Sequence, residues 1–300
     1  SVTTLTMASA SSFPSSGTVI IGSELIIYTG VSGNSLTGLT RGANGTTAAS
    51  HSSGATVKDA SGYAGWNTAV SGDVVTAPGL WSLDNFGNKL IATITGGESF
   101  EWDSNPTIAN NTRATIISGA PTASEFSLVS TPDRHVVFFG TETTIGTSST
   151  QDPMFIRFSS QEDINTYTPS ATNTAGTQRL SDGSKIVGAI RGRDAIYVWT
   201  DTALFIMRFV GPPFTFSFQQ VGTNCGLIGK NAAVEVDGTA YWMSENGFFR
   251  YTGKLESLPC LVEDHVYDDI NTTPKQHINV GLNNLFGEIM WFYPNSGSGT

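Results

Sequence analysis

Charged residues and cysteines are scarce in this chain of 300 residues. Asp, Glu, Lys and Arg together make up 13% of it, about half of the ~25% typical of soluble domains. The only two cysteines, Cys225 and Cys260, are too few for a disulfide framework. We therefore expect two separate buried thiols, the alternative being a single bond between them. No apolar run approaches the ~20 residues of a membrane-spanning helix.

Basic residues are the rarer charged type, with 15 Lys and Arg against 25 Asp and Glu and a formal net charge of −10. A protein that holds nucleic acid by its phosphates needs a basic face, which this composition argues against. A wall along which a polyanion slides without adhering remains compatible with it. The opening SVTTLTMASASSFPSSG has neither the basic start nor the apolar centre of a signal peptide.

Hydrophobic residues and glycine are plentiful. Hydrophobic residues make up 39% of the chain, enough for a packed core, and there are 33 glycines. With so few charges, Ser, Thr, Asn and Gly must cover the surface, which favours an all-β protein with many turns. The chain opens without Met and ends soon after a strong strand, so we expect it to be part of a longer polypeptide.

The pattern along the chain predicts four segments. We expect residues 1–12 to be a flexible N-terminal segment, 13–58 a small four-stranded β-module, 59–79 a linker and 80–300 a β-propeller-like domain, incomplete at its C-terminal end. The four strands of the module are expected at 19–21, 24–28, 35–40 and 55–57, separated by turns rich in Gly, Ser and Asn. So small a module must lean on another domain or chain.

Strand groups recur along the second half of the chain. Short apolar strands begin near Lys89, His135, Lys185, Ala232 and His277, at intervals of 46, 50, 47 and 45 residues. The stretch IVGAIRGRDAIYVWTDTALFIMRF, residues 186–209, contains three such strands joined by tight turns. Periods of 40 to 50 residues with several strands each are typical of propeller blades. A β-sandwich, whose strands recur every 8 to 12 residues without a longer period, is the alternative.

Motifs for catalysis and metal binding are not found. The four histidines show no spacing suited to zinc, and there is no nucleophile elbow, Walker loop or dinucleotide fingerprint. Ser82–Gly87 resembles the start of an Asp-box, a turn-stabilising element of sialidase propellers. The sequence thus predicts no catalytic residue, metal site or cofactor.

One acidic cluster lies in VEDHVYDDI, residues 262–270, which predicts at best a short helical turn. Paired carboxylates could serve as acid and base or bind calcium, but the spacing fits no calcium motif and a solvated patch is favoured. Its members are Glu263, Asp264, Asp268 and Asp269.

Two stretches carry a resemblance to a known family. LWSLDNFGNKLIATITGGESFEWD and the region from DPMFIRFSS to NGFFRYTG, most specifically Asp201–Gly229, resemble the tail nozzle proteins (tail tubular protein B-like) and the packaged-DNA stabilisation proteins of short-tailed bacteriophages. The N-terminal module resembles a small β-module of phage structural proteins. The resemblance implies a propeller in each subunit and a homo-oligomeric, hexameric ring below portal and adaptor proteins with tail fibres around it.

The expected function is accordingly that of a non-catalytic structural protein of the virion tail, a nozzle or hub subunit. It would form part of the channel for genome ejection and hold packaged DNA, and double-stranded DNA would pass through without being tightly bound. Subunit or channel contacts are expected at Arg191 and Arg193, which flank a turn glycine, and at the four carboxylates of residues 263–269. The alternatives are a receptor-binding propeller and a glycan-degrading, sialidase-like propeller of a phage tail.

Overall fold

The computed structural model of the chain describes residues 3–43, 46–60, 80–103 and 114–297. It divides into two compact units, Ser1–Pro78 and Gly79–Thr300. Most of the expected linker, residues 61–79, lies outside the described residues.

The N-terminal unit consists of two three-stranded antiparallel sheets. The strand orders are β3-β2-β6 and β1-β5-β4, with β1 at Thr4–Thr6, β2 at Gly17–Ile21, β3 at Glu24–Tyr28, β4 at Gly30–Ser32, β5 at Ser35–Thr37 and β6 at Lys58–Asp59. Its core is formed by Val19, Ile21, Ile26, Tyr28 and Leu36, all essentially inaccessible to solvent.

This unit differs from the expectation at both ends. The segment expected to be flexible contributes β1, which pairs with β5, and Ala10, which is buried in the core. Residues 55–57 form no strand. The edge strand of the β3-β2-β6 sheet is instead β6, the polar pair Lys58–Asp59, which pairs with β2. Strand β1 could not be predicted from the first twelve residues, because they are rich in Ser and Thr and polar side chains on an edge strand show no apolar periodicity.

The larger unit is a series of antiparallel sheets and has a β-propeller-like all-β fold. Its described residues form four four-stranded sheets and one two-stranded sheet, each a simple up-and-down meander. The first two have β7 (Trp81–Phe86), β8 (Lys89–Ile94), β9 (Ser99–Asp103) and β10 (Thr115–Ile116), then β11 (Phe126–Ser130), β12 (His135–Phe139), β13 (Phe155–Phe158) and β14 (Gly176–Arg179).

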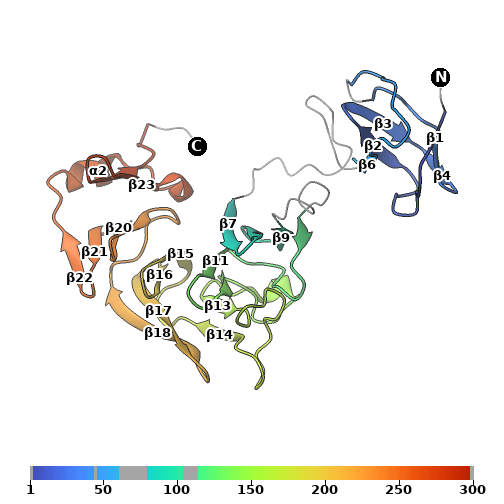
Figure 1. Cartoon of the computed structure of the whole chain (residues 1–300). Helices are drawn as coiled ribbons and strands as arrows, with labels where there is room; N and C mark the ends of the chain where they lie inside the picture. Colours follow the sequence, from blue (N-terminus) through green and yellow to red (C-terminus); the bar gives the residue numbers. More distant parts are fainter. Residues whose placement is uncertain (1–2, 44–45, 61–79, 104–113, 298–300) are drawn as a thin grey trace. The chain divides into compact units, whose positions relative to one another are not determined.

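The remaining sheets repeat the same plan. They contain β15 (Ile186–Arg191), β16 (Ile196–Thr200), β17 (Ala203–Gly211) and β18 (Thr215–Thr223), then β19 (Ala233–Val236), β20 (Thr239–Ser244), β21 (Gly247–Tyr251) and β22 (Leu255–Leu258), and finally β23 (Asn279–Asn283) and β24 (Glu288–Phe292). Figure 1 shows the sheets following one another around an arc, with β14, β18 and β22 on its outer side. The first strands of successive sheets are neighbours, β7 beside β11, β11 beside β15, β15 beside β19 and β19 beside β23.

Strand pairing distinguishes this fold from a sandwich. Ile91 of β8 faces Asp84 and Glu101 of the adjoining strands in its own sheet, and Val234 of β19 faces Tyr241 in another. Each sheet therefore pairs within itself, and side chains fill the space between sheets. We call the sheets that begin with β7, β11, β15, β19 and β23 blades 1 to 5. The core between blades 3 and 4 contains the pair Trp199 and Trp242, whose ring centroids lie 5.3 Å apart.

The expected repeat is correct in kind but shifted in phase. The first strands begin at Trp81, Phe126, Ile186, Ala233 and Asn279, at intervals of 45, 60, 47 and 46 residues. The markers near Lys89 and His135 start second strands, whereas those near Lys185 and Ala232 start first strands. Two long connections in blade 2 account for the long interval: residues 140–154 between β12 and β13, and residues 159–175 between β13 and β14.

Candidate functional site

A cavity of about 380 Å³ lies where the blades begin. Its lining includes one residue from the segment before the first strand of each of the five sheets, between one and four positions before the strand starts, namely Leu80, Glu125, Lys185, Lys230 and Lys275. Since the first strands are the inner ones, this cavity lies at one end of the propeller axis. We call it the axial cavity.

Three lysines enter the axial cavity from the segments that precede the inner strands of blades 3, 4 and 5. Lys185, Lys230 and Lys275 are spaced by 45 residues, slightly less than the intervals of 47 and 46 residues between the starts of those strands. Three of the 15 basic residues of an acidic chain thus meet in one cavity. The fold brings them together because these segments lie at the same end of neighbouring inner strands.

Close backbone packing positions two of these lysines. A side chain at Gly188 of β15 would meet the Lys230 carbonyl oxygen at 2.9 Å, and one at Gly229 would collide with the carbonyl oxygen of Lys275. Each lysine-bearing segment therefore lies against a residue without a side chain in the preceding part of the propeller. The lysine backbones are set by this packing rather than by exposed loops.

Lys230 is the most sheltered of the three. Its Nζ atom lies 5.1 Å from the centroid of the Phe126 ring, within the range of a cation–π contact. Burial lowers the pKa of Lys230, and the charge of Glu125 acts in the opposite direction. In the described part of the chain, no carboxylate forms an ion pair with its ammonium group.

The other charged groups of the axial cavity are unequally engaged. Lys275 forms an ion pair with Glu245, whereas Lys185 is exposed and has no ion pair among the described residues. Asp201 accepts hydrogen bonds from the Ser184 amide at 2.8 Å and hydroxyl at 2.5 Å, which lower its pKa against the opposing effect of burial. The cavity thus presents two ammonium groups without a carboxylate partner.

The arginines expected at subunit or channel contacts lie at the opposite ends of the inner strands. Arg191 ends β15 and donates from Nη1 to Asp84 Oδ1 at 2.9 Å and to the Val129 carbonyl at 3.3 Å. It lines a cavity of about 270 Å³ together with Arg193. Arg191 is thus engaged within its own chain, and no ion pair of Arg193 occurs among the described residues.

Asp84 belongs to the stretch that resembles an Asp-box, but the stretch does not form a turn. Ser82–Phe86 lie in the inner strand β7, and only Gly87, with φ +62°, is in the turn that follows. The Ser82 hydroxyl and the Asp84 carboxylate accept the amides of Ser127 and Val129 on β11, at 3.0 and 2.8 Å. These side chains join blade 1 to blade 2.

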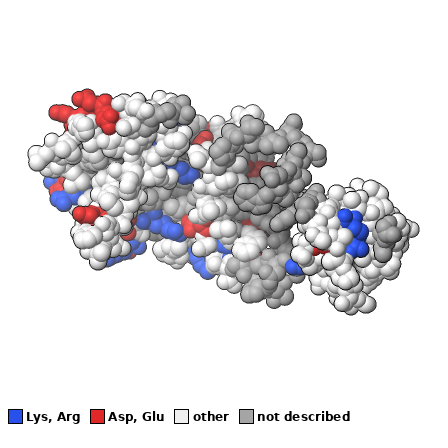
Figure 2. Space-filling view, turned by 90° about the horizontal axis from the view of Figure 1, so that it is seen from above, with Lys and Arg blue, Asp and Glu red and all other residues white. Residues whose placement is uncertain are grey.

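The four carboxylates expected at contacts lie together on one short helix. Helix α2 spans Glu263–Asp269 and carries all of them, and Val266 and Tyr267 pack against the core of blade 4. Figure 2 shows acidic side chains gathered at the side of the larger unit where Figure 1 places α2. The described residues contain no group of three or more side chains arranged to hold a metal ion.

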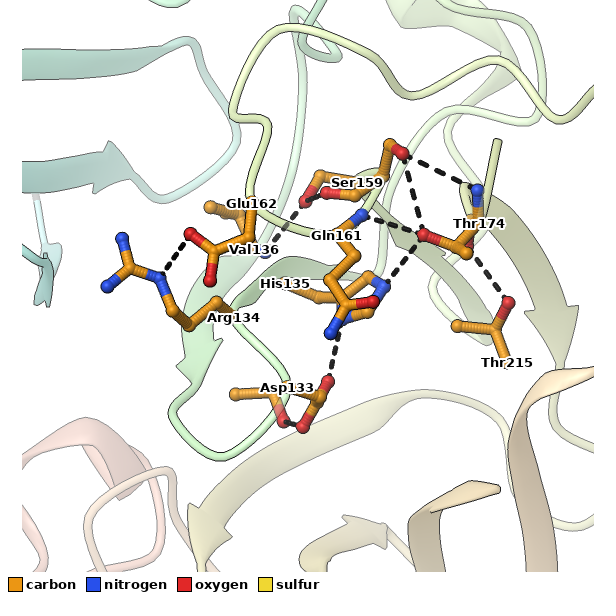
Figure 3. A network of polar contacts seen from close by, with 11 residues as sticks. Asp133, Arg134, His135, Val136, Ser159, Gln161, Glu162, Thr174 and Thr215 are labelled. Carbon is orange, nitrogen blue, oxygen red and sulfur yellow. Dashed lines mark hydrogen bonds and ion pairs between the residues drawn. The ribbon is translucent and has the colours of Figure 1, made fainter. Parts of the chain in front are cut away.

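A buried polar network resembles a catalytic triad in the order of its contacts (Figure 3). Asp133 contacts His135 Nδ1 at 2.7 Å, and His135 Nε2 contacts the Thr174 hydroxyl at 3.2 Å. The imidazole is completely buried, between the rings of Phe158, Phe209 and Phe216.

The same network has a structural use. The Thr174 hydroxyl oxygen also accepts the Gln161 amide at 2.7 Å, so it holds the backbone of the segment that contains Gln161. Neither His135 nor Thr174 lines the axial cavity or the cavity at Arg191 and Arg193. The network fastens residues 159–175 to the β11–β12 turn, and Tyr167, with 1% exposure, anchors the middle of the segment.

Comparison with known proteins identifies no relative by sequence: no family model and no curated protein matches the chain. Among solved structures, the extracellular domain of a putative one-component system from B. thetaiotaomicron aligns with a TM-score of 0.44 at 13% identity. The alignment covers 97% of this chain and 39% of that chain. We draw no functional conclusion from a similarity at this level.

The axial lysines were missed at the sequence level although a signal was present. The signal is the spacing of 45 residues between Lys185, Lys230 and Lys275, which is close to the length of one blade. No helix in the described residues is long and apolar enough to cross a membrane.

Proposed function

We propose that this chain is a structural, non-catalytic protein of a phage tail, a nozzle or hub subunit that assembles with further copies of itself. The assembled ring surrounds the path by which the genome leaves the virion. Portal or adaptor proteins and tail fibres are its neighbours in this proposal, and the DNA is guided rather than gripped. The sequence resemblance to tail nozzle and packaged-DNA stabilisation proteins motivates the assignment.

The observation that carries the assembly is the exposure of apolar side chains on the first and last sheets. Leu83 of β7 is 63% exposed, and Leu285 and Phe286 of the β23–β24 turn are 84% and 71% exposed. Further exposed apolar residues of these two sheets are Trp81, Ile116, Leu282, Met290 and Phe292. Apolar surface of this extent on an otherwise polar protein is typical of an interaction site, and an assembly would cover it.

The surface chemistry agrees with a conduit. The chain has an excess of ten acidic residues over basic ones, and like charge weakens the hold of a protein on phosphates. Many of the exposed residues are Ser, Thr, Asn or Gly, which are uncharged and interact with DNA phosphates less strongly than Lys or Arg.

Sedimentation velocity and electron microscopy test this proposal. We expect concentration-dependent rings, and density for this chain on the tail axis of the virion from which it comes. The double substitution Leu285→Ser and Phe286→Ser should shift the distribution towards monomers. Phe214→Ser, an equally exposed residue of the β17–β18 turn at 79%, is the matched control and should not. A chain that remains monomeric at all concentrations and lies on the capsid exterior would exclude the tail role.

A further inference from the structure

We propose that the axial cavity binds a small organic anion, whose carboxylate or phosphate group contacts Lys185 and Lys230 and whose apolar part lies against the wall beside them. This inference does not depend on the proposed tail function. It assigns a ligand site to a feature that a purely mechanical role leaves without a purpose.

The first argument is the state of the two ammonium groups. Lysine has three N–H donors and no acceptor, and neither Lys185 nor Lys230 has an ion-pair partner in the described part of the chain. By contrast, Lys275, Lys89 and Arg41 all form ion pairs with carboxylates. An anion entering the cavity would receive charge-assisted hydrogen bonds, the stronger kind.

The second argument is that the facing carboxylates are engaged elsewhere. Three acidic residues line the cavity: Glu125, Asp201 and Glu245. Asp201 is bound to Ser184, Glu245 to Lys275, and Glu125 accepts from the Gln151 amide group at 3.3 Å. Glu125 is the nearest competitor for Lys230, since its charge raises the pKa of that lysine. A cation site is not favoured, because the described residues offer no set of three metal ligands.

The third argument is the shape and polarity of the wall. A cavity of about 380 Å³ lies within the range of roughly 300–1,000 Å³ typical of small-molecule sites. The apolar residues of its lining include Phe126, Ile186, Leu227 and Ile228, which belong to the packed cores and are at most 4% exposed. Apolar walls with a few convergent charged groups favour a ligand with an apolar body and one anionic end.

Calorimetric titration of the whole chain with four probes tests the proposal. The probes are phenyl phosphate, benzoate, inorganic phosphate and the neutral benzyl alcohol, all at constant ionic strength. We expect one saturable site for phenyl phosphate or benzoate and at least about tenfold weaker binding of benzyl alcohol. The ratio of the first two affinities shows whether phosphate or carboxylate is preferred, and inorganic phosphate shows whether the anionic end suffices.

Substitutions then place the site. Lys230→Met should weaken the affinity for the tighter-binding probe at least about tenfold, and Lys230→Arg should retain binding. Lys254→Met, at an exposed lysine before β22, should leave the affinity within about twofold of the parent value. If Lys230→Met does not fold, Lys185→Met, at the exposed lysine of the cavity, gives the same comparison. The proposal would be overturned by the absence of saturable binding up to about 10 mM, a limit well above the mM affinities of weak ligands. It would also be overturned by equal affinity in the Met variants and the control.

Discussion

Arg191 and Asp84 form an ion pair between blades that are not adjacent. Arg191 ends the inner strand of blade 3, Asp84 lies in the inner strand of blade 1, and the two are 107 residues apart in sequence. The guanidinium also donates to the Val129 carbonyl of the blade between them. One side chain therefore links three consecutive blades at the centre of the propeller.

We predict that the two members of this pair contribute unequally to stability. The Asp84 side chain is only 11% exposed and accepts the Val129 amide as well as Arg191, whereas the Arg191 side chain is 42% exposed. Asp84→Ala leaves a buried amide unsatisfied and should cost about 2 kcal/mol of unfolding free energy. Arg191→Met removes the exposed half of the pair and should cost about 0.5 kcal/mol.

Urea denaturation followed by tryptophan fluorescence measures both values, since Trp199 and Trp242 are completely buried in this unit. Asp194→Ala, at an exposed aspartate of the neighbouring turn, is the control and should change stability by less than about 0.5 kcal/mol. Equal costs for Asp84→Ala and Arg191→Met would contradict the unequal roles.

A second prediction concerns the buried carboxylate of the N-terminal unit. Glu24 is completely buried and receives Nε and Nη2 of Arg41 at 2.6 and 2.7 Å, the amides of Gly42 and Ala49 at 3.0 Å, and His51 Nε2 at 2.7 Å. The bidentate contact with Arg41 lowers the pKa of Glu24 far below its usual range, against the opposing effect of burial, with the other contacts adding to the lowering.

Because the folded state holds this carboxylate ionised while an unfolded glutamate titrates near pH ~4.3, the unfolded state takes up the proton first. The stability of the unit should therefore be constant above about pH 5 and should fall as the pH decreases below about 4.3. Hydrogen exchange of the β2 and β3 amides between pH 3 and 6 measures this slope.

Glu24→Gln supplies the test of that origin. It should abolish most of the slope and lower the stability at pH 7 by about 3 kcal/mol, because Arg41 is left without its partner. Arg41→Lys keeps the charge but loses the two-point contact, and should give an intermediate result. A slope that persists in Glu24→Gln would assign it to other groups.

A third prediction concerns the two thiols. Both cysteines are free, as expected for separate thiols, but only Cys225 is buried and Cys260 is half-buried. Burial raises the pKa of Cys225 to about 11, so it is protonated at pH 8 and shielded from reagents. Titration of the native chain with a thiol reagent should show one fast and one slow cysteine.

Cys260→Ser should remove the fast phase, and denaturation of the parent chain should expose two thiols. Since the ionised form of Cys225 is favoured only in the unfolded state, stability should also decline as the pH rises above about 8.5. Two fast thiols, or none before reduction, would contradict the structure.

The sequence was most informative where strands are apolar throughout. Residues 186–209 predicted β15, β16 and β17 correctly, because β16 and the first half of β17 are buried on both faces and read as continuous hydrophobic runs. The predicted start of blade 1 was wrong because β7 contains Ser82, Asp84 and Asn85, whose polar side chains interrupt the apolar pattern of a strand.

Other features depend on contacts distant in sequence. The 60-residue interval of blade 2 could not be explained without the contacts of Asp133, His135 and Thr174, which hold the extra segment in place. The expected short helix at residues 262–270 is present as α2. The helix packs on blade 4 through Val266 and Tyr267. This contact could not be predicted, because a helix of seven residues is too short to show a helical period in its apolar residues.

The last prediction is that the isolated chain binds duplex DNA weakly. Double-stranded DNA carries about one charge per 1.7 Å of axis, so a few cations free to contact phosphates would suffice for strong binding. In the described residues Arg134, Arg179 and Arg250 are paired with acidic side chains, and Arg157 donates to three backbone carbonyls. We expect a dissociation constant no tighter than ~10⁻⁴ M at physiological salt.

Charge on α2 provides the matched comparison for that measurement. Replacing Glu263, Asp264, Asp268 and Asp269 by Lys changes the formal charge by two at each of four positions, from −10 to −2, and creates a basic patch on a single helix. This variant should bind duplex DNA more tightly, with an affinity that falls steeply as salt is raised, whereas the Gln and Asn variant at the same positions should bind as weakly as the parent. Fluorescence anisotropy at two salt concentrations distinguishes the three proteins. Sub-micromolar, salt-sensitive binding by the parent chain would show that its few unpaired cations bind DNA phosphates strongly. The parent chain could then not form a conduit that releases DNA readily.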